Sequence, residues 1–370
     1  MKRRKILICH YVPHIISGAE KAILDMVLPL QNVFDFTMFV PSEGILAEFY
    51  RKQGLKVHVQ KLSNKRRKFP GLHMFHSLLF KQYLKKNHYD LLLCNTFFAA
   101  NKMTTVARLS KIPMAIFVRE YIDLKLPIHK HYIESAVALF GVSQDVADYL
   151  KPAHKRVYTT HDFLDTVMIS KIDTTKKTLE SSGEKVALIG RITPYKQQDL
   201  FIQAFSYVQK KVPNVEFYII GDAWGKEHAF KAELIEKAKE ISKNIIFLGN
   251  RNDVYELLPQ FSVSCMVSDR EPFPRTVLEA QYLKVPVVAS NTGGVKEMIE
   301  DNVSGLFFDV VGKDPLLLAE KIVELLEDKN KAEAIANAAY KSLMNSFATQ
   351  APLDNFKNVL NDLIGEQEWK

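Results

Sequence analysis

The chain has only three cysteines in 370 residues, and this scarcity excludes two kinds of architecture. Cys9, Cys94 and Cys265 stand singly inside apolar runs, without the numbers of a disulfide framework or the paired spacing of a zinc site. We therefore expect three buried thiols. No apolar run reaches the roughly 18 residues that a membrane-spanning helix needs. The basic residues 2–5 are followed by a stretch that His10 and His14 interrupt, with no small-residue cleavage site, so we expect a protein that is not exported.

The length and the amino-acid composition of the chain suit two globular domains. The length exceeds that of one typical domain, and 47% of the residues are hydrophobic against 25% charged. Short β-rich runs alternate with longer helical patterns, which predicts an α/β fold with two parallel sheets wound by helices. A segment rich in Thr, Ser and Lys, residues 165–183, is interpreted as a linker. The expected strands are 6–9, 36–40, 55–59, 90–94, 114–118 and 136–140, and then 185–189, 215–220, 245–248, 263–267, 285–289 and 305–308.

Positive charge is concentrated in the first half of the chain. Residues 1–170 carry a net charge of +12 and residues 171–370 a net charge of −4. Lys65–Lys68 and the helical pattern with Lys81, Lys85 and Lys86 place basic groups beside Phe69, Phe75, Leu78, Leu79 and Phe80. A basic amphipathic helix can lie on an anionic membrane surface, where each basic side chain contributes about 1 kcal/mol. A solvated basic face or a nucleic-acid patch fits the charges alone equally well.

The most informative stretch runs from Glu271 to Glu297. It reads E-P-F-P-R-T-V-L-E-A, then V-P-V-V-A-S, then G-G-V-K-E. The two prolines keep Glu271 out of the helix that we expect to begin near Arg275, because proline suits only a first helical turn. A strand, loop and helix in this order aim backbone N–H groups at a crevice where phosphate binds, and a carboxylate there accepts from hydroxyls. An isolated E-x7-E would more often be two solvated carboxylates.

A second motif lies between a predicted strand and a predicted helix over 198–208. Gly190-Arg191-Ile-Thr-Pro-Tyr-Lys196 occupies the turn at the carboxyl end of the strand, the usual ligand position in parallel sheets. Glycine admits close approach, and two cations five residues apart can bracket a diphosphate. The alternative is that Arg191 and Lys196 are surface charges on a loop.

Together these motifs resemble the donor-sugar module of retaining GT-B glycosyltransferases, family 4 in particular, and they occur in the expected order over nearly the whole chain. The resemblance implies two Rossmann-like domains facing across a cleft, with a last helix that crosses back to the first domain. We therefore expect an acceptor-binding domain over residues 1–168, a nucleotide-sugar-binding domain over 169–348 and a returning helix within 349–370.

The resemblance also implies roles for individual residues. Arg191 and Lys196 would hold the donor phosphates, Glu271 the hydroxyls of the transferred sugar, and Glu279 the ribose. Two positions depart from the family pattern, since Ser17 stands for the first glycine of G-G-x-E and Gln197 for the glycine after the lysine; we expect the second to matter little. The expected donor-binding residues are Gly18, Gly190, Arg191, Lys196, Glu271, Phe273, Pro274, Arg275, Thr276 and Glu279.

Arg119 and Glu120 follow a predicted strand at a point where many relatives place a histidine that faces the reacting sugar. Arg119 is a candidate for holding an acceptor phosphate or the donor, and Glu120 for polarising the acceptor hydroxyl. A structural Arg–Glu ion pair is the alternative. With these two, the candidate catalytic residues are Arg191, Lys196, Glu271, Arg119 and Glu120.

By this resemblance the chain moves a sugar from a UDP- or GDP-sugar to a glycan or lipid-linked acceptor, with retention of configuration. The absence of an Asp-x-Asp triplet agrees with an enzyme that needs no metal or other cofactor. We expect cytoplasmic location, contact with the inner membrane face through the basic first half, and no nucleic-acid partner. The alternatives are a nucleotide-sugar epimerase or hydrolase on the same fold, or a non-catalytic nucleotide-binding scaffold.

Overall fold

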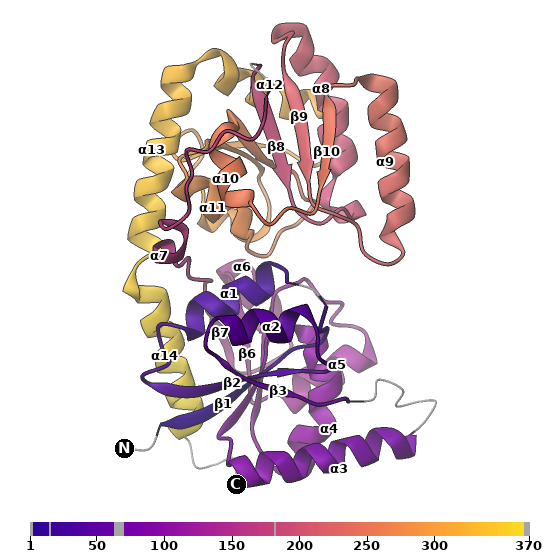
Figure 1. Ribbon diagram of the computed structural model, residues 1–370, viewed down its shortest axis with the longest axis vertical. Coiled ribbons are helices and arrows are strands. Elements are labelled where there is room, and N and C mark those ends of the chain that lie inside the picture. The colour runs from indigo at the N-terminus through magenta and orange to yellow at the C-terminus, as the bar shows by residue number, and fades with distance from the viewer. Residues whose placement is uncertain (1–2, 15, 63–69, 181–182, 366–370) are drawn as a thin grey trace. The chain divides into compact units, whose positions relative to one another are not determined.

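The computed structural model describes residues 3–14, 16–62, 70–180 and 183–365. They form two compact units, of which unit 1 comprises Met1–Phe163 with Gln350–Lys370 and unit 2 comprises Leu164–Thr349. Each unit is a parallel β-sheet with helices packed against it (Figure 1). The α/β class and the two Rossmann-like sheets predicted from the alternating pattern are confirmed.

The sheet of unit 1 has the strand order β3-β2-β1-β4-β5-β6-β7, with every pair parallel. The central strands β4 and β5 are buried throughout, as expected for apolar strands covered on both faces. The sequence pattern missed β7, because a half-buried strand of three residues at the sheet edge shows no periodicity. The strands are β1 Arg4–Cys9, β2 Phe34–Val40, β3 Lys56–Val59, β4 Leu91–Cys94, β5 Met114–Val118, β6 Ala138–Gly141 and β7 Val157–Thr159.

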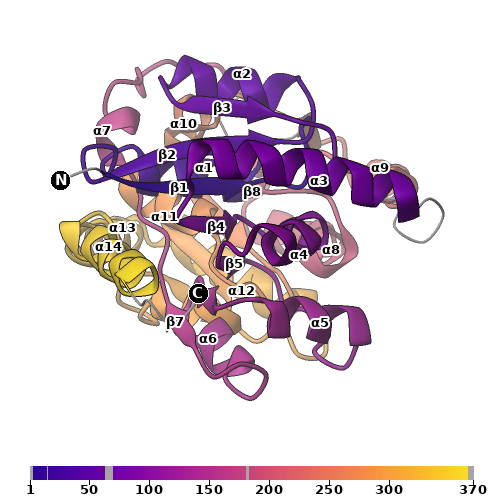
Figure 2. The same cartoon turned by 90° about the horizontal axis from the view of Figure 1, so that it is seen from below.

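Helices cover both faces of this sheet, with α14 on one side and α3, α4 and α5 on the other (Figure 2). Phe356 of α14 packs against the rings of Phe117 and Phe140, at centroid distances of 5.8 and 6.2 Å. The last helix therefore belongs to the first unit, as the fold class predicted. The helices are α1 Gly18–Val27, α2 Ile45–Lys52, α3 Pro70–Asn87, the 3-10 turn η1 Phe97–Ala99, α4 Ala100–Ser110, α5 Pro127–Ser135, α6 Gln144–Leu150 and α14 Gln350–Gly365.

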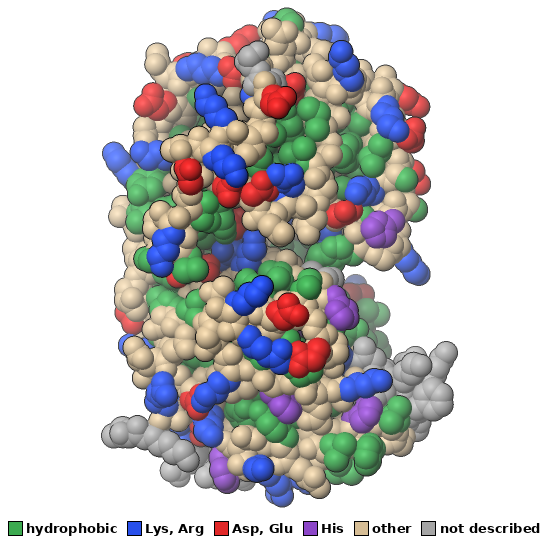
Figure 3. All heavy atoms as spheres, in the orientation of Figure 1, with side chains coloured by type: hydrophobic (Ala, Val, Ile, Leu, Met, Phe, Trp, Pro, Cys, Tyr) green, Lys and Arg blue, Asp and Glu red, His purple; other side chains and the backbone are tan. Residues whose placement is uncertain are grey.

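Helix α3 leaves much of its apolar surface uncovered. Figure 3 shows hydrophobic side chains gathered at the surface over this helix. The most exposed of them are Leu72, Met74, Phe75, Leu78 and Leu79, which are 40–57% exposed. No helix within the described ranges is long and apolar enough to cross a bilayer.

The sheet of unit 2 has the order β10-β9-β8-β11-β12-β13 and is also parallel. Phe201 and Phe205 of α8 pack against Phe217 of β9, at 4.5 and 5.2 Å between centroids, within the main core of the unit. The strands are β8 Lys185–Ile189, β9 Glu216–Ile220, β10 Ile245–Gly249, β11 Val263–Met266, β12 Val287–Ser290 and β13 Leu306–Phe308. The helices are α7 Thr166–Ile169, η2 Pro194–Lys196, α8 Gln198–Lys211, α9 Glu227–Ile241, α10 Val254–Leu257, η3 Leu258–Gln260, α11 Arg275–Tyr282, η4 Gly293–Glu297, α12 Pro315–Glu327 and α13 Lys329–Ser346.

In each sheet the first strand lies in the middle, and the direction in which successive strands are added reverses once. In unit 1 the chain proceeds outward from β1 to β3 and then returns to β4 on the other side of β1; in unit 2 it returns to β11 beside β8 in the same way. Ligands of open parallel sheets bind outside the carboxyl ends of the strands at such a reversal. The expected ligand positions are therefore the loops that follow β1 and β4 in unit 1, and β8 and β11 in unit 2.

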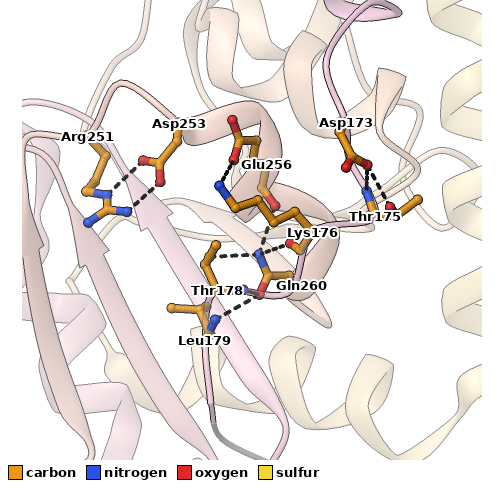
Figure 4. Close-up of polar contacts among 9 residues, drawn as sticks. All are labelled: Asp173, Thr175, Lys176, Thr178, Leu179, Arg251, Asp253, Glu256 and Gln260. Carbon is orange, nitrogen blue, oxygen red and sulfur yellow. Dashed lines mark hydrogen bonds and ion pairs between the residues drawn. The ribbon is translucent and has the colours of Figure 1, made fainter.

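Residues 176–179 of the segment that we interpreted as a linker are held by polar contacts with other residues of unit 2 (Figure 4). The Gln260 side-chain oxygen accepts hydrogen bonds from the backbone N–H groups of Thr178 and Leu179, at 2.9 and 3.0 Å. Lys176 Nζ lies 3.5 Å from Glu256 Oε2. Apart from α7, the described residues of this segment form no regular secondary structure, which is why the composition alone resembled a linker.

Candidate functional site

Three neighbouring loops of unit 2 follow β8, β11 and β12, which lie side by side and parallel, so the loops emerge at one edge of the sheet. The loops after β8 and β11, together with α11, carry the residues predicted to bind a donor, apart from Gly18 of unit 1. The backbone N–H of Asp269 donates to the Tyr195 carbonyl at 2.9 Å, and that of Gly294 donates to the Glu271 carbonyl at 3.0 Å. These bonds join the three loops into one structure, in which the glycines of G-G-V-K-E support the Glu271 loop.

Lys196 and Glu271, predicted from separate motifs, form a direct ion pair. Lys196 Nζ lies 2.6 Å from Glu271 Oε2, and both side chains are mostly buried. Burial alone would lower the pKa of Lys196, but the nearby Glu271 carboxylate outweighs it and raises that pKa above its ordinary value. The ammonium therefore stays protonated through the neutral range. The loop after β8 thus presents a permanent cation beside a carboxylate of the loop after β11.

Arg191 points to a different partner. Its Nε lies 3.6 Å from Glu227 Oε2 at the start of α9, and its guanidinium lies 4.9 Å from the centroid of the Trp224 ring. Arg191 and Lys196 share the loop that begins at Gly190, but only Lys196 is paired with one of the predicted carboxylates. Glu227 and Trp224 were not found from the sequence, because they belong to the loop after β9 and to α9, where no motif marks them.

Glu279 lies in α11, the helix that begins at Arg275 as predicted. Its Oε1 accepts a hydrogen bond from the Tyr255 hydroxyl at 2.9 Å, and Arg275 Nε lies 3.7 Å away. The carboxylate is therefore held at a fixed position inside the unit. Tyr255 is a further residue that sequence reasoning missed, since α10 carries no recognisable motif.

Among the residues between Glu271 and Glu279, Phe273 and Pro274 are buried and Thr276 is partly exposed. Phe273 packs its ring edge-on against Phe347, with 5.2 Å between the centroids, so the ring belongs to the core. Pro274 precedes the first residue of α11 in an extended conformation, with φ −77° and ψ 111°. Thr276 is the second residue of the helix and is partly exposed. Any ligand contact by Phe273 or Pro274 would therefore be made by backbone atoms.

Gln197, where the family pattern has glycine, is more important than the sequence suggested. It adopts a left-handed conformation, with φ 54° and ψ 38°, which glycine adopts freely and which costs another residue on the order of 1 kcal/mol. Its side chain is almost wholly buried and donates through Nε2 to Asp269 Oδ2 at 2.6 Å. This bond offsets the strain and adds a link between the Lys196 loop and the Glu271 loop.

In unit 1, Gly18 begins α1 and Ser17 caps it. The Ser17 hydroxyl accepts from the Ala19 N–H at 3.3 Å, and Glu20 Oε2 accepts from the Ser17 N–H at 3.0 Å, which is a capping box. Burial raises the pKa of Glu20, but His10 Nδ1 at 3.7 Å and the Ser17 bonds lower it further than burial raises it. The structure therefore gives Ser17 and Glu20 a clear structural role at the helix start. The helix ends at Val27, and residues 28–30 form a bend and a turn.

Arg119 forms an ion pair with Asp162, a partner that the sequence did not suggest. Arg119 Nη1 lies 2.6 and 2.7 Å from the two Asp162 oxygens, and its Nε donates to the Asn95 carbonyl at 3.1 Å. The Arg119 and Asp162 side chains are 8% and 4% exposed. Asp162 follows β7, the strand that the pattern missed, so its approach to Arg119 could not be seen in the sequence. Glu120 is partly buried next to this pair.

The comparisons with known proteins agree with this geometry. Residues 170–342 match the family model described as "Glycosyl transferases group 1". The chain is 25% identical over 249 residues to the N-acetyl-alpha-D-glucosaminyl L-malate synthase of Bacillus anthracis, covering 66% of this chain and 63% of that protein. It is 25% identical over 185 residues to the capsular polysaccharide biosynthesis glycosyltransferase CapM of Staphylococcus aureus, covering 50% and 48%. The chain thus spans less than two thirds of the length of these curated relatives.

The fold also matches solved structures over almost its whole length. The crystal structure of Anabaena HepE in complex with UDP and glucose superposes with a TM-score of 0.82 at 21% identity, covering 97% of this chain and 100% of that one. The architecture is therefore that of GT-B glycosyltransferase structures, and residues 170–342, which match the group 1 glycosyl transferase model, contain the Lys196–Glu271 pair and Glu279.

Proposed function

We propose that the protein is a glycosyltransferase that moves a sugar from a nucleoside diphosphate sugar, a UDP-sugar in particular, to a hydroxyl of a glycan acceptor. The Lys196–Glu271 ion pair carries this proposal, because it places a permanent cation and a carboxylate at the carboxyl edge of a parallel sheet, where the strand order reverses. A diphosphate next to sugar hydroxyls needs these two groups. The UDP and glucose named for the HepE structure support the choice of donor.

The proposed mechanism depends on charge at the leaving group. Breaking the sugar–phosphate bond builds negative charge on the diphosphate, and fixed cations stabilise that transition state more than the ground state. We assign this role to Lys196 and Arg191, the sugar hydroxyls to Glu271 and the ribose hydroxyls to Glu279. Transfer with retention brings the acceptor hydroxyl to the face that the diphosphate leaves, with a phosphate oxygen taking its proton, so the carboxylate pair of a glycosidase is not required.

The proposed acceptor is a growing cell-surface or lipid-linked glycan. The capsular polysaccharide role named for the CapM relative supports it. The acceptor would bind at the carboxyl edge of the unit 1 sheet, where the loop after β1 leads to Gly18 and the loops after β5 and β7 bring Arg119 and Asp162 together. Because Asp162 neutralises Arg119, this site suits an uncharged hydroxyl group better than a phosphate.

Binding of UDP tests the donor site. UDP should raise the melting temperature of the protein, because a ligand stabilises the state that it binds. Glu279→Gln should weaken UDP binding about tenfold or more, since hydrogen bonds to a charged group contribute about 1.5–3 kcal/mol. Isothermal calorimetry with UDP measures the dissociation constant, and release of UDP from a UDP-sugar with and without a glycan acceptor separates a transferase from an epimerase or hydrolase.

Glu216→Gln is the matched control for this variant. Glu216 also accepts a tyrosine hydroxyl, that of Tyr218 at 2.7 Å, but it begins β9 at the amino edge of the sheet. The control should bind UDP as the unaltered protein does. Equal loss of UDP affinity in both variants, or no effect of UDP on the unaltered protein, would contradict the assignment.

We further propose that unit 1 contacts an anionic membrane surface through α3, which would place the enzyme on the inner face of the membrane. The exposed apolar side chains Leu72, Phe75 and Leu79 share one helix face with the exposed Lys86. An apolar stripe that continues into a cation suits lipid chains below anionic headgroups. The predicted basic segment Lys65–Lys68, with Phe69, lies outside the described residues and adds to the proposal only through its sequence.

Co-sedimentation with vesicles of phosphatidylglycerol and phosphatidylcholine checks this proposal. Phe75→Glu with Leu79→Glu should lower the bound fraction about tenfold or more, because each substitution replaces buried apolar area worth about 1.5 kcal/mol or more by a charge that anionic lipids repel. The control is Val303→Glu with Val311→Glu, which changes two exposed apolar residues of unit 2, 47% and 80% exposed. Unchanged binding of the α3 variant would rule out this helix as the contact.

A further inference from the structure

A cavity of about 460 Å³ lies between α4 and α5 of unit 1, away from the loops discussed above. It is lined by Thr104, Thr105 and Arg108 of α4, by Lys111 and its neighbours before β5, and by His131 and Ser135 of α5. Met114, the first residue of β5, and Val137, just before β6, form part of its wall. The cavity therefore opens at the amino ends of these strands, at the opposite edge of the sheet from Arg119 and Asp162. Its volume lies in the range of small-molecule sites, which is roughly 300–1,000 Å³.

The cavity is lined by basic side chains and by no acidic ones. Arg108, Lys111 and His131 contribute nitrogen donors, and the lining contains neither Asp nor Glu. Within the described part of the chain, none of these three side chains has a carboxylate partner; the α5 carboxylate Glu134 lies 3.8 Å from Lys130 instead. Cations near the carboxyl end of α4 are favoured by the helix dipole, which accounts for Arg108 and Lys111 singly. The helix dipole does not account for the position of Arg108 and Lys111 beside His131 of another helix, around a cavity that no carboxylate lines.

The hydroxyl groups of the lining add a second kind of recognition. Thr104 donates its hydroxyl proton to the Ala100 carbonyl at 2.7 Å, and Ser135 donates to the His131 carbonyl at 2.7 Å. Because both protons are used inside the helices, the two oxygens remain as hydrogen-bond acceptors. Acceptors of this kind bind ligand hydroxyls, while Arg108 and Lys111 bind ligand phosphate. Ala107, Pro113 and Val137 supply apolar surface for the body of such a ligand.

From these observations we propose that the cavity between α4 and α5 binds a small phosphorylated polyol, such as a sugar phosphate, at a site separate from the donor and acceptor edges. Arg108 and Lys111 hold the phosphate and His131 donates to it. The oxygens of Thr104 and Ser135 accept from the polyol hydroxyls. This assignment stands independently of the proposed transfer reaction, because it depends only on the residues that line the cavity.

Binding of glucose 6-phosphate is the test, measured by isothermal calorimetry with UDP present in excess so that the donor site is occupied. We expect saturable binding to the unaltered protein, and a dissociation constant about tenfold or more higher for Arg108→Gln with Lys111→Gln, since each change removes a charge-assisted hydrogen bond. Both residues are exposed at the end of α4, so the variant should fold as before. Lys85→Gln with Lys86→Gln makes the same change of charge on α3 and should leave the binding unaltered.

Two further probes define the ligand class. Inorganic phosphate should bind more weakly than glucose 6-phosphate, because it lacks the hydroxyls that Thr104 and Ser135 accept. Glucose should bind more weakly than either phosphate compound. The proposal is overturned if glucose 6-phosphate does not bind, if the Arg108 and Lys111 variant binds it unchanged, or if inorganic phosphate binds equally well.

Discussion

Replacement of Lys196 by methionine is expected to lower kcat/KM for the UDP-sugar about 100- to 1,000-fold, the loss typical of removing one group that stabilises transition-state charge. The side chain is mostly buried, its pKa is raised by the Glu271 carboxylate, and its loop is fixed to the Glu271 loop by the Gln197–Asp269 and Tyr195–Asp269 hydrogen bonds. Such a cation needs no rearrangement as charge builds on the diphosphate. The effect should appear mainly in kcat, measured as UDP release from the donor under saturating substrate.

The ion pair supplies its own control for this prediction. Lys196→Met alone leaves the Glu271 carboxylate without its partner, which could disturb the loop as well as remove the cation. The double variant Lys196→Met with Glu271→Gln removes both charges, so recovery of activity in the double variant would mean that loop disturbance caused the loss. Lys196→Arg keeps the charge and should retain far more activity than Lys196→Met. A methionine variant with full kcat would refute the assigned role of Lys196.

The pH dependence follows from the direction of the pKa shift. Because the folded-state pKa of Lys196 is raised above that of an unfolded chain, the ionisation of Lys196 stabilises the fold at neutral pH and up to the ordinary lysine value. The contribution is lost only as the pH rises through the higher folded-state value. Loss of activity near neutral pH should therefore be unrelated to ionisation of Lys196.

The part of the site that could be predicted from sequence is the part built from single continuous segments. The Glu271–Glu279 stretch fixes a loop and a helix start by its two prolines, and α11 does begin at Arg275. The apolar runs before Gly190 and Glu271 predict parallel strands, and adjacent parallel strands place their following loops together. Lys196 and Glu271 are 75 residues apart in sequence, yet their contact follows from the pairing of β8 with β11.

The part that could not be predicted depends on side-chain partners in segments without motifs. Asp162 meets Arg119 only because β7 extends the sheet beyond β6, and β7 is too short to show a pattern. Gln197 was expected to matter little, because the sequence shows a missing glycine but not the Asp269 carboxylate that the new side chain reaches. In both cases the geometry of a loop, rather than the type of residue, determines the partner.

At Gly221, by contrast, the residue type itself matters, because the close packing of two loops requires glycine. It follows β9 with φ +138°, and its backbone N–H donates to the Gly249 carbonyl at 2.8 Å. A Cβ atom at this position would lie 2.0 Å from the Gly190 carbonyl oxygen and 2.7 Å from the Gly190 carbonyl carbon. Both are backbone atoms, so no side chain can move aside. The Gly190 loop, which carries Lys196, would have to shift.

Gly221→Ala is therefore expected to lower the free energy of unfolding by about 3 kcal/mol, at the upper end of overpacking substitutions, and to weaken UDP binding as the Lys196 loop moves. Gly312→Ala is the matched control, because Gly312 also has a positive φ, +83°, but no atom lies within 4 Å of its added Cβ. Backbone strain alone should cost that control about 1 kcal/mol and leave UDP affinity unchanged. Urea denaturation measures both stabilities and calorimetry measures UDP binding. Equal destabilisation of the two variants would show that strain, and not the close approach of Gly221 to Gly190, explains the glycine.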